Sequence, residues 1–493
     1  MRFTYTVAGF FLLILVPFIS PAAAADWPQF RGPRGQGHSD ATELPLKWSE
    51  TENITWKVPV EGRGWSSPVI RGNEIWMTTA LATIAKPEVA RQKLDSLGFA
   101  VPSPEVAERI VLKAVEFDRE SGRLIRSVTL LKIDKLLQIC EVNSYASPTP
   151  VIEAGRLYCD FGTMGTVCLD TATGKTLWER HLPVEHQVGP GSSPILYGKL
   201  LVLVRDGCDV QYIAALDKQT GDIVWKTPRP PIKGTYTPYK KAFSTPLVID
   251  HGGRRQMVSM GAQWIVSYDP DTGKELWRVD TGQSFSNTAR PVFGNGLVFV
   301  STAFGGSELF AIRPDGRGDV TDTHISWTAR KQVPQMPSPL LVENLLYTVS
   351  DGGVAMCTDA VTGKVHWTKR LSGKYYASPI FGAGRIYFFS EDGEATVIRP
   401  GNKFVELTKN KLDGRFMASA AVSGRALFLR NDTHLYRIEQ KNDTSRKEDG
   451  KKLDVLLGKP AVVAVGRPED KMWGLYQFPS LFRLADGVLL GNE

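Results

Sequence analysis

A twelve-residue pattern that ends in tryptophan recurs along the chain and constrains the fold more than any other feature. It reads "VCLDTATGKTLW" at 167–178, "AALDKQTGDIVW" at 214–225, "VSYDPDTGKELW" at 266–277 and "MCTDAVTGKVHW" at 356–367. The Asp-x-x-Thr-Gly segment is typical of a hairpin turn, in which glycine takes a positive φ while Asp and Thr bond nearby backbone donors. The Trp then falls on the strand after the turn, where a large ring can fill the space between packed sheets. The pattern therefore predicts a repeated antiparallel unit.

The spacing of the units predicts the architecture. Trp178, Trp225, Trp277, Trp327 and Trp367 lie 40 to 52 residues apart, and each unit contains four strand-like runs. Four strands in roughly 40 to 50 residues is the size of a propeller blade. The units begin at Ser67-Pro68, Ser147-Pro148, Ser193-Pro194, Thr245-Pro246, Arg290-Pro291, Ser338-Pro339, Ser378-Pro379 and Ser419-Ala420. We therefore expect an all-β fold, an eight-bladed β-propeller of four-stranded antiparallel blades, over residues 26–440.

The eighth unit lacks a Thr-Gly…Trp segment of its own. The stretch "ENITWKVPV" around Trp56 reads like the fourth strand of the other units. We expect the strand at 53–58 to complete the last blade and close the ring, which removes a free sheet edge. The first blade carries an interruption at about 81–111. Its segments "KPEVARQKLDSLGF" and "SPEVAERIVLKAV" have helical spacing with an early Pro, so they predict a helical insertion.

The two ends of the chain read differently from the repeats. Residues 1–25 contain Arg2, an apolar run at 7–19 and small residues before Asp26, which predicts a cleaved signal peptide. The alternative, a membrane anchor, is disfavoured because a spanning helix needs about 20 apolar residues. Asp26 is not the Cys of a lipidation site, so we expect a periplasmic or secreted protein with no transmembrane segment after cleavage. At the other end we expect a charged linker at 441–452 and a C-terminal extension at 453–493. That extension is either the truncated start of a sialidase-like propeller or a segment packed on the ring.

The chain has five cysteines, at 140, 159, 168, 208 and 357. A turn centred on residues 163 and 164 would place Cys159 opposite Cys168 on one face of a hairpin. An exported protein could oxidise such a pair to a disulfide. The alternative is two small buried apolar residues, because cross-strand geometry fits a disulfide only in some cases.

Composition and motifs exclude several kinds of chemistry. Removal of residues 1–25 leaves 58 basic and 52 acidic residues, and this modest excess does not require a nucleic-acid partner. The seven His residues form no zinc-binding pattern, and no nucleophile elbow, phosphate loop or dinucleotide fingerprint is present. The sequence therefore predicts no catalytic residue and no metal site.

Two columns of residues precede the Pro of each unit, at the third and fifth positions. In an extended strand both columns face the same way, because side chains alternate with a period of two. We therefore predict an aromatic-lined, cationic mouth of the central channel that receives an acidic ligand or a loop of a protein partner. The alternative is a solvated rim whose aromatic residues merely pack. The candidate residues are Arg63, Trp65, Tyr145, Lys241, Phe243, Lys374, Tyr376 and Arg415.

The segments "DWPQFRGPRGQGHSD", "NSYASPTPV", "GPGSSPIL", "KAFSTPLV" and "SEDGEATVI" resemble the PQQ-type (quinoprotein-like) β-propeller repeat proteins. The similarity extends over nearly all of the chain after residues 1–25, and is greatest to the BamB-like group of planctomycete type. It implies an eight-bladed propeller with one of two roles. Quinoprotein alcohol dehydrogenases have an adjacent Cys pair, a catalytic Asp and calcium ligands, but no two cysteines are adjacent here. The outer-membrane assembly proteins are non-enzymatic scaffolds with a lipidated Cys, which this sequence also lacks.

Taken together, these features favour an exported, monomeric, non-enzymatic scaffold that binds a protein partner in the cell envelope, with no cofactor expected. The first alternative is an oxidoreductase that depends on PQQ with Ca²⁺. The second is a carbohydrate-binding propeller, suggested by the sialidase-like wording of the tail.

Overall fold

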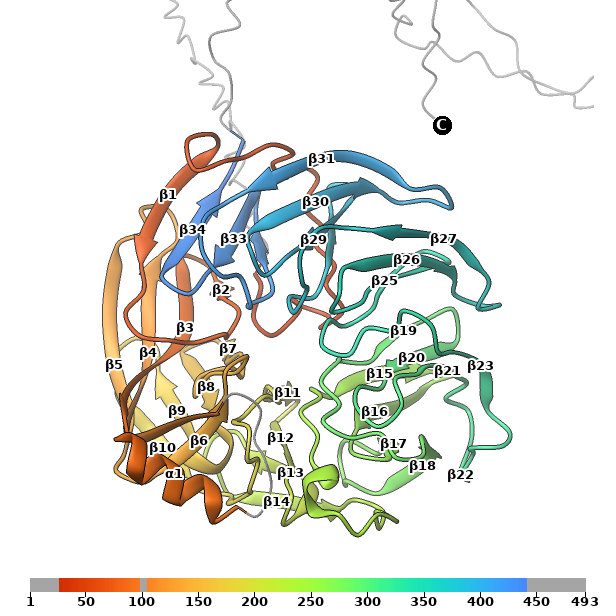
Figure 1. The fold of residues 1–493 in the computed structure, drawn as a ribbon, viewed down its shortest axis with the longest axis horizontal. Helices are drawn as coiled ribbons and strands as arrows, with labels where there is room; N and C mark the ends of the chain where they lie inside the picture. Colours follow the sequence, from red (N-terminus) through yellow and green to blue (C-terminus); the bar gives the residue numbers. More distant parts are fainter. Residues whose placement is uncertain (1–25, 98–103, 441–493) are drawn as a thin grey trace, which may run out of the picture. The chain divides into compact units, whose positions relative to one another are not determined.

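The computed structural model describes residues 26–97 and 104–440. The signal peptide, the charged linker and the C-terminal extension predicted above lie outside these residues. Eight antiparallel sheets surround a central channel, as Figure 1 shows. The eight-bladed propeller expected from the spacing of the repeats is therefore confirmed.

The first four blades contain most of the departures from a plain four-stranded sheet. From the channel outward, blade one comprises β2 (Val69–Arg71), β3 (Glu74–Ile84), β4 (Pro104–Asp118) and β5 (Leu124–Ile133), with β6 (Leu137–Cys140) also paired to β4. Blade two comprises β7 (Val151–Glu153), β8 (Arg156–Asp160), β9 (Thr166–Asp170) and β10 (Thr176–Arg180), and blade three β11 (Ile195–Tyr197), β12 (Leu200–Asp206), β13 (Gln211–Asp217) and β14 (Ile223–Pro228). Blade four comprises β15 (Leu247–His251), β16 (Arg254–Met260), β17 (Trp264–Tyr268) and β18 (Glu275–Asp280), with β22 (Gly318–Asp319) added in parallel.

The remaining blades follow the repeat closely. Blade five comprises β19 (Val292–Gly294), β20 (Leu297–Ser301), β21 (Leu309–Ile312) and β23 (Ile325–Ala329), and blade six β24 (Leu340–Val342), β25 (Leu345–Val349), β26 (Val354–Asp359) and β27 (Val365–Arg370). Blade seven comprises β28 (Ile380–Gly382), β29 (Arg385–Phe389), β30 (Glu394–Arg399) and β31 (Val405–Lys411). Blade eight comprises β32 (Ala421–Ser423), β33 (Ala426–Arg430), β34 (His434–Ile438) and, from the other end of the ring, β1 (Ile54–Pro59).

The ring is closed by the strand predicted at 53–58. β1 pairs antiparallel with β34, with Ile54 opposite Ile438 and Pro59 opposite His434. The outermost strand of the last blade thus comes from the start of the ring. Because β34 would otherwise carry unpaired backbone groups, this pairing covers a sheet edge.

The repeated Trp and the repeated Gly are found together because they touch across the boundary between blades. The indole of Trp178 in blade two covers Gly221 in the turn of blade three, and Trp225 covers Gly273 in the same way. Both glycines have positive φ, +74° and +71°. A Cβ atom on Gly221 would lie 2.7 Å from the indole, so glycine is required for the turn and for the contact.

The prediction of a helical insertion in the first blade is half correct. The first segment forms α1 (Pro87–Asp95), but the second is the beginning of β4. In β4 the side chains of Ile110, Leu112 and Ala114 are buried while those between them are more exposed, which is a period of two. The strand lies between β3 and β5, and this pairing overrides the local helical spacing.

The structure does not support the disulfide between Cys159 and Cys168, since all five cysteines are free. A short 3₁₀ turn, η1 (Gly162–Met164), lies in the hairpin loop, and Cys168 pairs with Tyr158 while Cys159 pairs with Val167. The register is therefore one residue from the predicted one. A shift of one residue turns a side chain to the opposite face of the sheet, so the two thiols enter different hydrophobic clusters.

Two buried ion pairs help to hold blades two, three and four together, one between blades two and three and one within blade three. The guanidinium of Arg205 in β12 lies 2.7 Å from the carboxylate of Asp160 in β8, and that of Arg229 lies 2.8 Å from the carboxylate of Asp206. Arg229 also donates to Ser259 Oγ in blade four at 2.8 Å. Each pair satisfies its charges internally, which is the condition for burying charge in a core.

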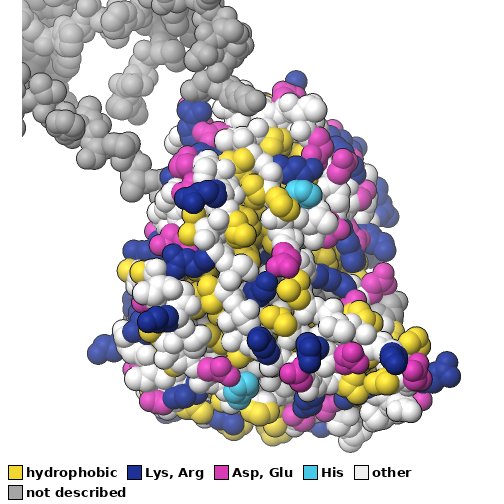
Figure 2. Space-filling view, turned by 90° about the vertical axis from the view of Figure 1, so that its left-hand side faces the viewer, with side chains coloured by type: hydrophobic (Ala, Val, Ile, Leu, Met, Phe, Trp, Pro, Cys, Tyr) yellow, Lys and Arg dark blue, Asp and Glu magenta, His cyan; other side chains and the backbone are white. Residues whose placement is uncertain are grey.

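The outer wall of the ring carries no large field of one sign on the face seen in Figure 2, where Lys and Arg side chains are interspersed with Asp and Glu. Within residues 26–97 and 104–440, no helix combines the length and the apolar character that crossing a bilayer requires.

Candidate binding channel

A cavity of about 690 Å³ occupies the central channel. Its wall contains one third-position residue from each of the eight blades, so this column faces the channel. The column consists of Trp65, Ser147, Gly191, Phe243, Thr288, Met336, Tyr376 and Met417. Trp65, Phe243 and Tyr376 are thus brought together as predicted, with Met417 in the same wall.

Tyr145 is not among the residues that line the channel. Blade two begins at Thr149-Pro150 and not at Ser147-Pro148. Counted from Pro150, the third position is Ser147 and Tyr145 moves to the fifth. The Tyr145 ring is buried, and its hydroxyl donates to Leu137 O at 2.8 Å while accepting from Ala107 N at 3.2 Å. The sequence did indicate this starting point. In the other blades the Pro, or Ala420 in blade eight, is followed directly by two apolar residues, and this is true of Pro150 but not of Pro148.

The sequence predicted a cationic mouth from the fifth-position residues, but two of these side chains are paired with carboxylates. Arg63 forms an ion pair with Glu105 at 3.0 Å, and Arg415 forms one with Glu391 at 2.6 Å. Both guanidinium groups also lie over the Trp65 ring, at 5.3 and 5.8 Å from its centroid. These two residues therefore fix the Trp65 indole in place more than they supply free charge.

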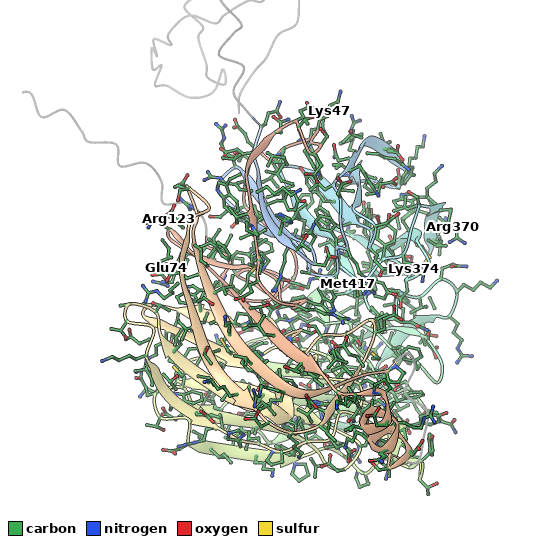
Figure 3. All side chains as sticks on the ribbon, turned by 60° about the vertical axis from the view of Figure 1, so that its left-hand side comes forward. Lys47, Glu74, Arg123, Arg370, Lys374 and Met417 are labelled. Carbon is green, nitrogen blue, oxygen red and sulfur yellow. The ribbon has the colours of Figure 1, made fainter. Side chains whose placement is uncertain are left out.

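The two lysines of the column differ in their surroundings. Lys241 is buried in the cavity wall, where its Nζ donates to Pro238 O at 2.7 Å and burial lowers its pKa. Lys374 lines a second cavity of about 390 Å³ together with Glu391, Asp392 and Arg415. Figure 3 shows Lys374 on the side of the ring that carries α1, away from Glu74. We call this side, where the fifth-position residues lie, the open end of the channel.

Sequence reasoning missed a cluster of aromatic side chains at the open end. Tyr239 stacks on Phe285 with ring centroids 4.1 Å apart, Tyr236 meets Tyr239 edge-on at 4.6 Å, and Phe285 lies 5.9 Å from Phe304. All four line the cavity, yet Tyr236, Tyr239 and Phe304 are 49, 48 and 41 % exposed. They come from three loops, one of which contains the 3₁₀ turn η2 (Thr237–Lys240) in the segment "GTYTPYKK". We call these four residues the aromatic cluster.

The Ser or Thr that begins most of the blades also has a structural role that the sequence did not reveal. Its hydroxyl accepts a hydrogen bond from the backbone amide of the equivalent residue in the preceding blade, at 2.9 to 3.0 Å in six places. These bonds join successive blades around the channel. The six acceptor side chains, which we call the hydroxyl ring, are Thr149, Ser193, Thr245, Ser338, Ser378 and Ser419.

The other end of the channel is crossed by the segment from Trp27 to Ser39. It hydrogen-bonds to the second residue after the Pro in blades one, two, five, six and seven, which lies on the opposite side of the hydroxyl ring from the third and fifth positions. The partners are Ile70, Ile152, Phe293, Leu341 and Phe381. Phe30 of this segment lies in the cavity wall. We call this the closed end.

Two arginines are fully buried at the closed end. Arg290 replaces the Ser or Thr of blade five, and its Nη1 donates to Phe30 O at 2.6 Å. Arg31 donates to Gln36 O at 2.9 Å, while its Nε and Nη1 have no partner among the described residues. Neither forms an ion pair within residues 26–97 and 104–440. Burial lowers the pKa of Arg290 to about 9, and burial together with the charge of Arg290 lowers the pKa of Arg31 to about 9.

The residues do not fit a quinone site that depends on calcium. In the described part of the chain, no group of three or more His, Cys, Asp or Glu side chains is placed to hold a metal ion. Calcium takes several oxygen ligands, among which carboxylates predominate. The sequence also has no adjacent Cys pair.

Comparison with solved structures places this fold among propellers of two kinds. The structure of BamB from Moraxella catarrhalis is similar with a TM-score of 0.53 at 12% identity, over 79% of this chain and 98% of that one. A quinohemoprotein alcohol dehydrogenase from Comamonas testosteroni is similar with a TM-score of 0.56 at 11% identity, over 85% and 82%. At such identities the likeness shows the fold alone.

Sequence comparison is more specific. The outer membrane protein assembly factor BamB of Shewanella oneidensis is 22% identical over 245 residues, which is 46% of this chain and 58% of that protein. The chain thus matches little more than half the length of this relative. A family model described as outer membrane protein assembly factor BamB matches residues 113–261, 261–321 and 318–415, more than half of the chain. The chain therefore belongs to the family of the outer membrane protein assembly factor BamB.

Proposed function

We propose that this protein is a non-enzymatic scaffold of the cell envelope, which binds a protein partner at the open end of its channel. The family supports the general role, because the relatives that it matches are named as outer membrane assembly factors. Their name also supports an envelope location, together with the signal peptide predicted from residues 1–25.

The aromatic cluster is the observation that carries the proposal. Three of its four rings leave more than two fifths of their surface exposed, although they stack on one another at the rim of a cavity. Exposed, mutually packed aromatic residues beside a cavity are typical of binding surfaces. Tyr in particular is enriched in protein interfaces, where its ring is buried and its hydroxyl is paired on contact.

Site-specific photo-crosslinking tests this proposal. A photoreactive phenylalanine analogue replaces Tyr239 in the aromatic cluster or, as a control of similar exposure, Leu124 on the outermost strand of blade one. We expect an envelope protein to be linked at position 239 in the native cell and not at position 124. Links confined to position 124, or none at either position, contradict the proposal.

Two further outcomes separate the alternatives. Addition of PQQ and Ca²⁺ to the purified protein should give neither a quinone absorption band nor dye reduction by alcohols or sugars. A quinone band together with dye reduction would contradict the scaffold role and show that the protein is an oxidoreductase. If the wild-type protein binds to a glycan array and the Tyr239→Ala variant does not, the protein is a carbohydrate-binding propeller and the scaffold role is contradicted.

A further inference from the structure

The hydroxyl ring offers hydrogen-bond donors that the protein does not use. Five of its members line the cavity, namely Thr149, Ser193, Thr245, Ser378 and Ser419. Each accepts a backbone amide proton, and none donates its own hydroxyl proton to another described residue. A hydroxyl has one proton to give. The ring therefore presents several donors around the axis of the channel, although all five side chains are at most 5 % exposed.

Arg290 independently indicates the sign of charge that this end of the channel favours. It stands in the hydroxyl position of blade five, where its backbone amide donates to Ser338 Oγ at 2.9 Å. Among the described residues its guanidinium donates to neutral oxygens, those of Phe30, Pro246 and Gln29, and it lies outside the wall of the cavity. A buried cation without a carboxylate is costly, and an anion placed nearby reduces that cost. The charge of Arg31 is close enough to be felt by Arg290, so two buried cations add positive potential at the closed end.

We propose that the hydroxyl ring binds the carboxy-terminal carboxylate of the partner's chain, which enters through the aromatic cluster, and that the buried charge of Arg290 behind the cavity wall favours this anion. This inference rests on the proposed function and names the part of the partner that the channel receives. A carboxylate is an acceptor-only group, so it complements a ring of hydroxyl donors, and a buried guanidinium behind the cavity wall favours its negative charge. Capture of a terminal carboxylate is a general mode of peptide recognition.

The shape of the channel favours a chain end over a loop. The segment that contains Phe30 crosses one end, so a ligand enters and leaves by the other. A residue of extended chain occupies about 150 Å³, from a rise of about 3.3 Å, a strand spacing of about 4.7 Å and a sheet spacing of about 10 Å. The cavity of about 690 Å³ thus takes roughly four residues of a single strand. Trp65, Phe243 and Tyr376 would then contact the side chains next to the terminal carboxylate.

A paired peptide array tests this assignment. Random octapeptides are synthesised with free carboxyl ends on one array and as carboxamides on a second, and both are probed with the purified full chain. We expect a subset of the free acids to bind and their carboxamides to bind at least 10-fold more weakly. Equal binding of the two forms overturns the proposal, as does binding of neither. Preference for peptides with an internal Asp or Glu, whatever their chain end, also overturns it and assigns the site to an acidic side chain.

Variants of the hydroxyl ring show where in the channel the peptides bind. Thr245→Val keeps the shape of the side chain and removes its hydroxyl, and Ser419→Ala is a second variant should the first fail to fold. Loss of one hydrogen bond to a charged group corresponds to about 10-fold or more in affinity. The control is Thr348→Val, which removes a buried hydroxyl from β25, outside the cavity wall.

The failure of this inference is distinguishable from failure of the proposed function. If the partner still crosslinks at position 239 but free-acid peptides neither bind nor compete, the scaffold role stands and the carboxylate site does not. If variants of the hydroxyl ring lower the affinity for free-acid peptides no more than Thr348→Val does, the hydroxyl ring has only its structural role.

Discussion

Replacement of Gly221 by Ala tests why Gly and Trp recur together in the sequence. Gly221 has φ +74°, and an added Cβ would lie 2.7 Å from Cε3 and 2.8 Å from Cδ2 of Trp178. The indole cannot readily withdraw, because its Nε1 donates to Lys218 O at 3.1 Å and its ring packs on Tyr158. The left-handed backbone costs a non-glycine residue about 1–2 kcal/mol. Overpacking adds about 1–3 kcal/mol, so Gly221→Ala should destabilise the fold by about 2–5 kcal/mol.

Gly198→Ala in the same blade is the matched control. Gly198 has φ +54° and no atom within 4 Å of an added Cβ, so its loss should be only the backbone cost of about 1–2 kcal/mol. The assay is urea denaturation followed by tryptophan fluorescence and far-UV circular dichroism. On a Trp178→Ala background, Gly221→Ala should cost no more than the control, because the clash is gone. Equal losses for the two glycines in the wild-type background would refute the explanation of the repeat.

Three further predictions concern buried groups elsewhere in the propeller. Asp206→Asn removes the charge that pairs with Arg229 at 2.8 Å, which should cost about 3–5 kcal/mol in urea denaturation; a loss below about 1 kcal/mol would contradict the buried pair. His186 is buried, and its pKa is lowered to about 3, mainly by burial and to a lesser extent by the charges of nearby cations. Because the unfolded His titrates near pH 6.5, its contribution to stability is present above that pH and is lost as pH falls toward 3. The wild type should therefore lose about 2 kcal/mol more between pH 7 and pH 5 than His186→Leu does, whereas parallel pH profiles would show that His186 is not held neutral. Thiol titration in denaturant without reductant should count all five cysteines, and a count of three would restore the disulfide.

Much of the fold could be predicted because the repeat depends on local chemistry. The Asp-x-x-Thr-Gly turn sets each hairpin, and the missing fourth strand of the last blade pointed to Trp56 and β1. The errors arose where two local patterns competed. Residues 104–118 have helical spacing but are held as a strand by β3 and β5. The extra turn at Gly162–Met164 shifted the register of Cys159.

The candidate site was predictable only in part. The third-position column depends on the strand register, so Trp65 and Tyr376 were found, while the doubled "SPTP" concealed Ser147. The aromatic cluster lies on loops of irregular length, whose folding no periodicity predicts. The charge of Arg63 was visible in the sequence, but its pairing with Glu105 depends on the long strand β4 and was not.

A footprint of the bound partner tests the central claim most directly, which is that the open end of the channel is the binding surface. Amide hydrogen exchange is compared between the free protein and its complex with the protein identified by crosslinking. We predict slower exchange at residues 236–243 and around Phe304, with no change in β5 on the outer wall. Slower exchange along β5 or β27, with unchanged exchange in the loops of the aromatic cluster, would contradict the account.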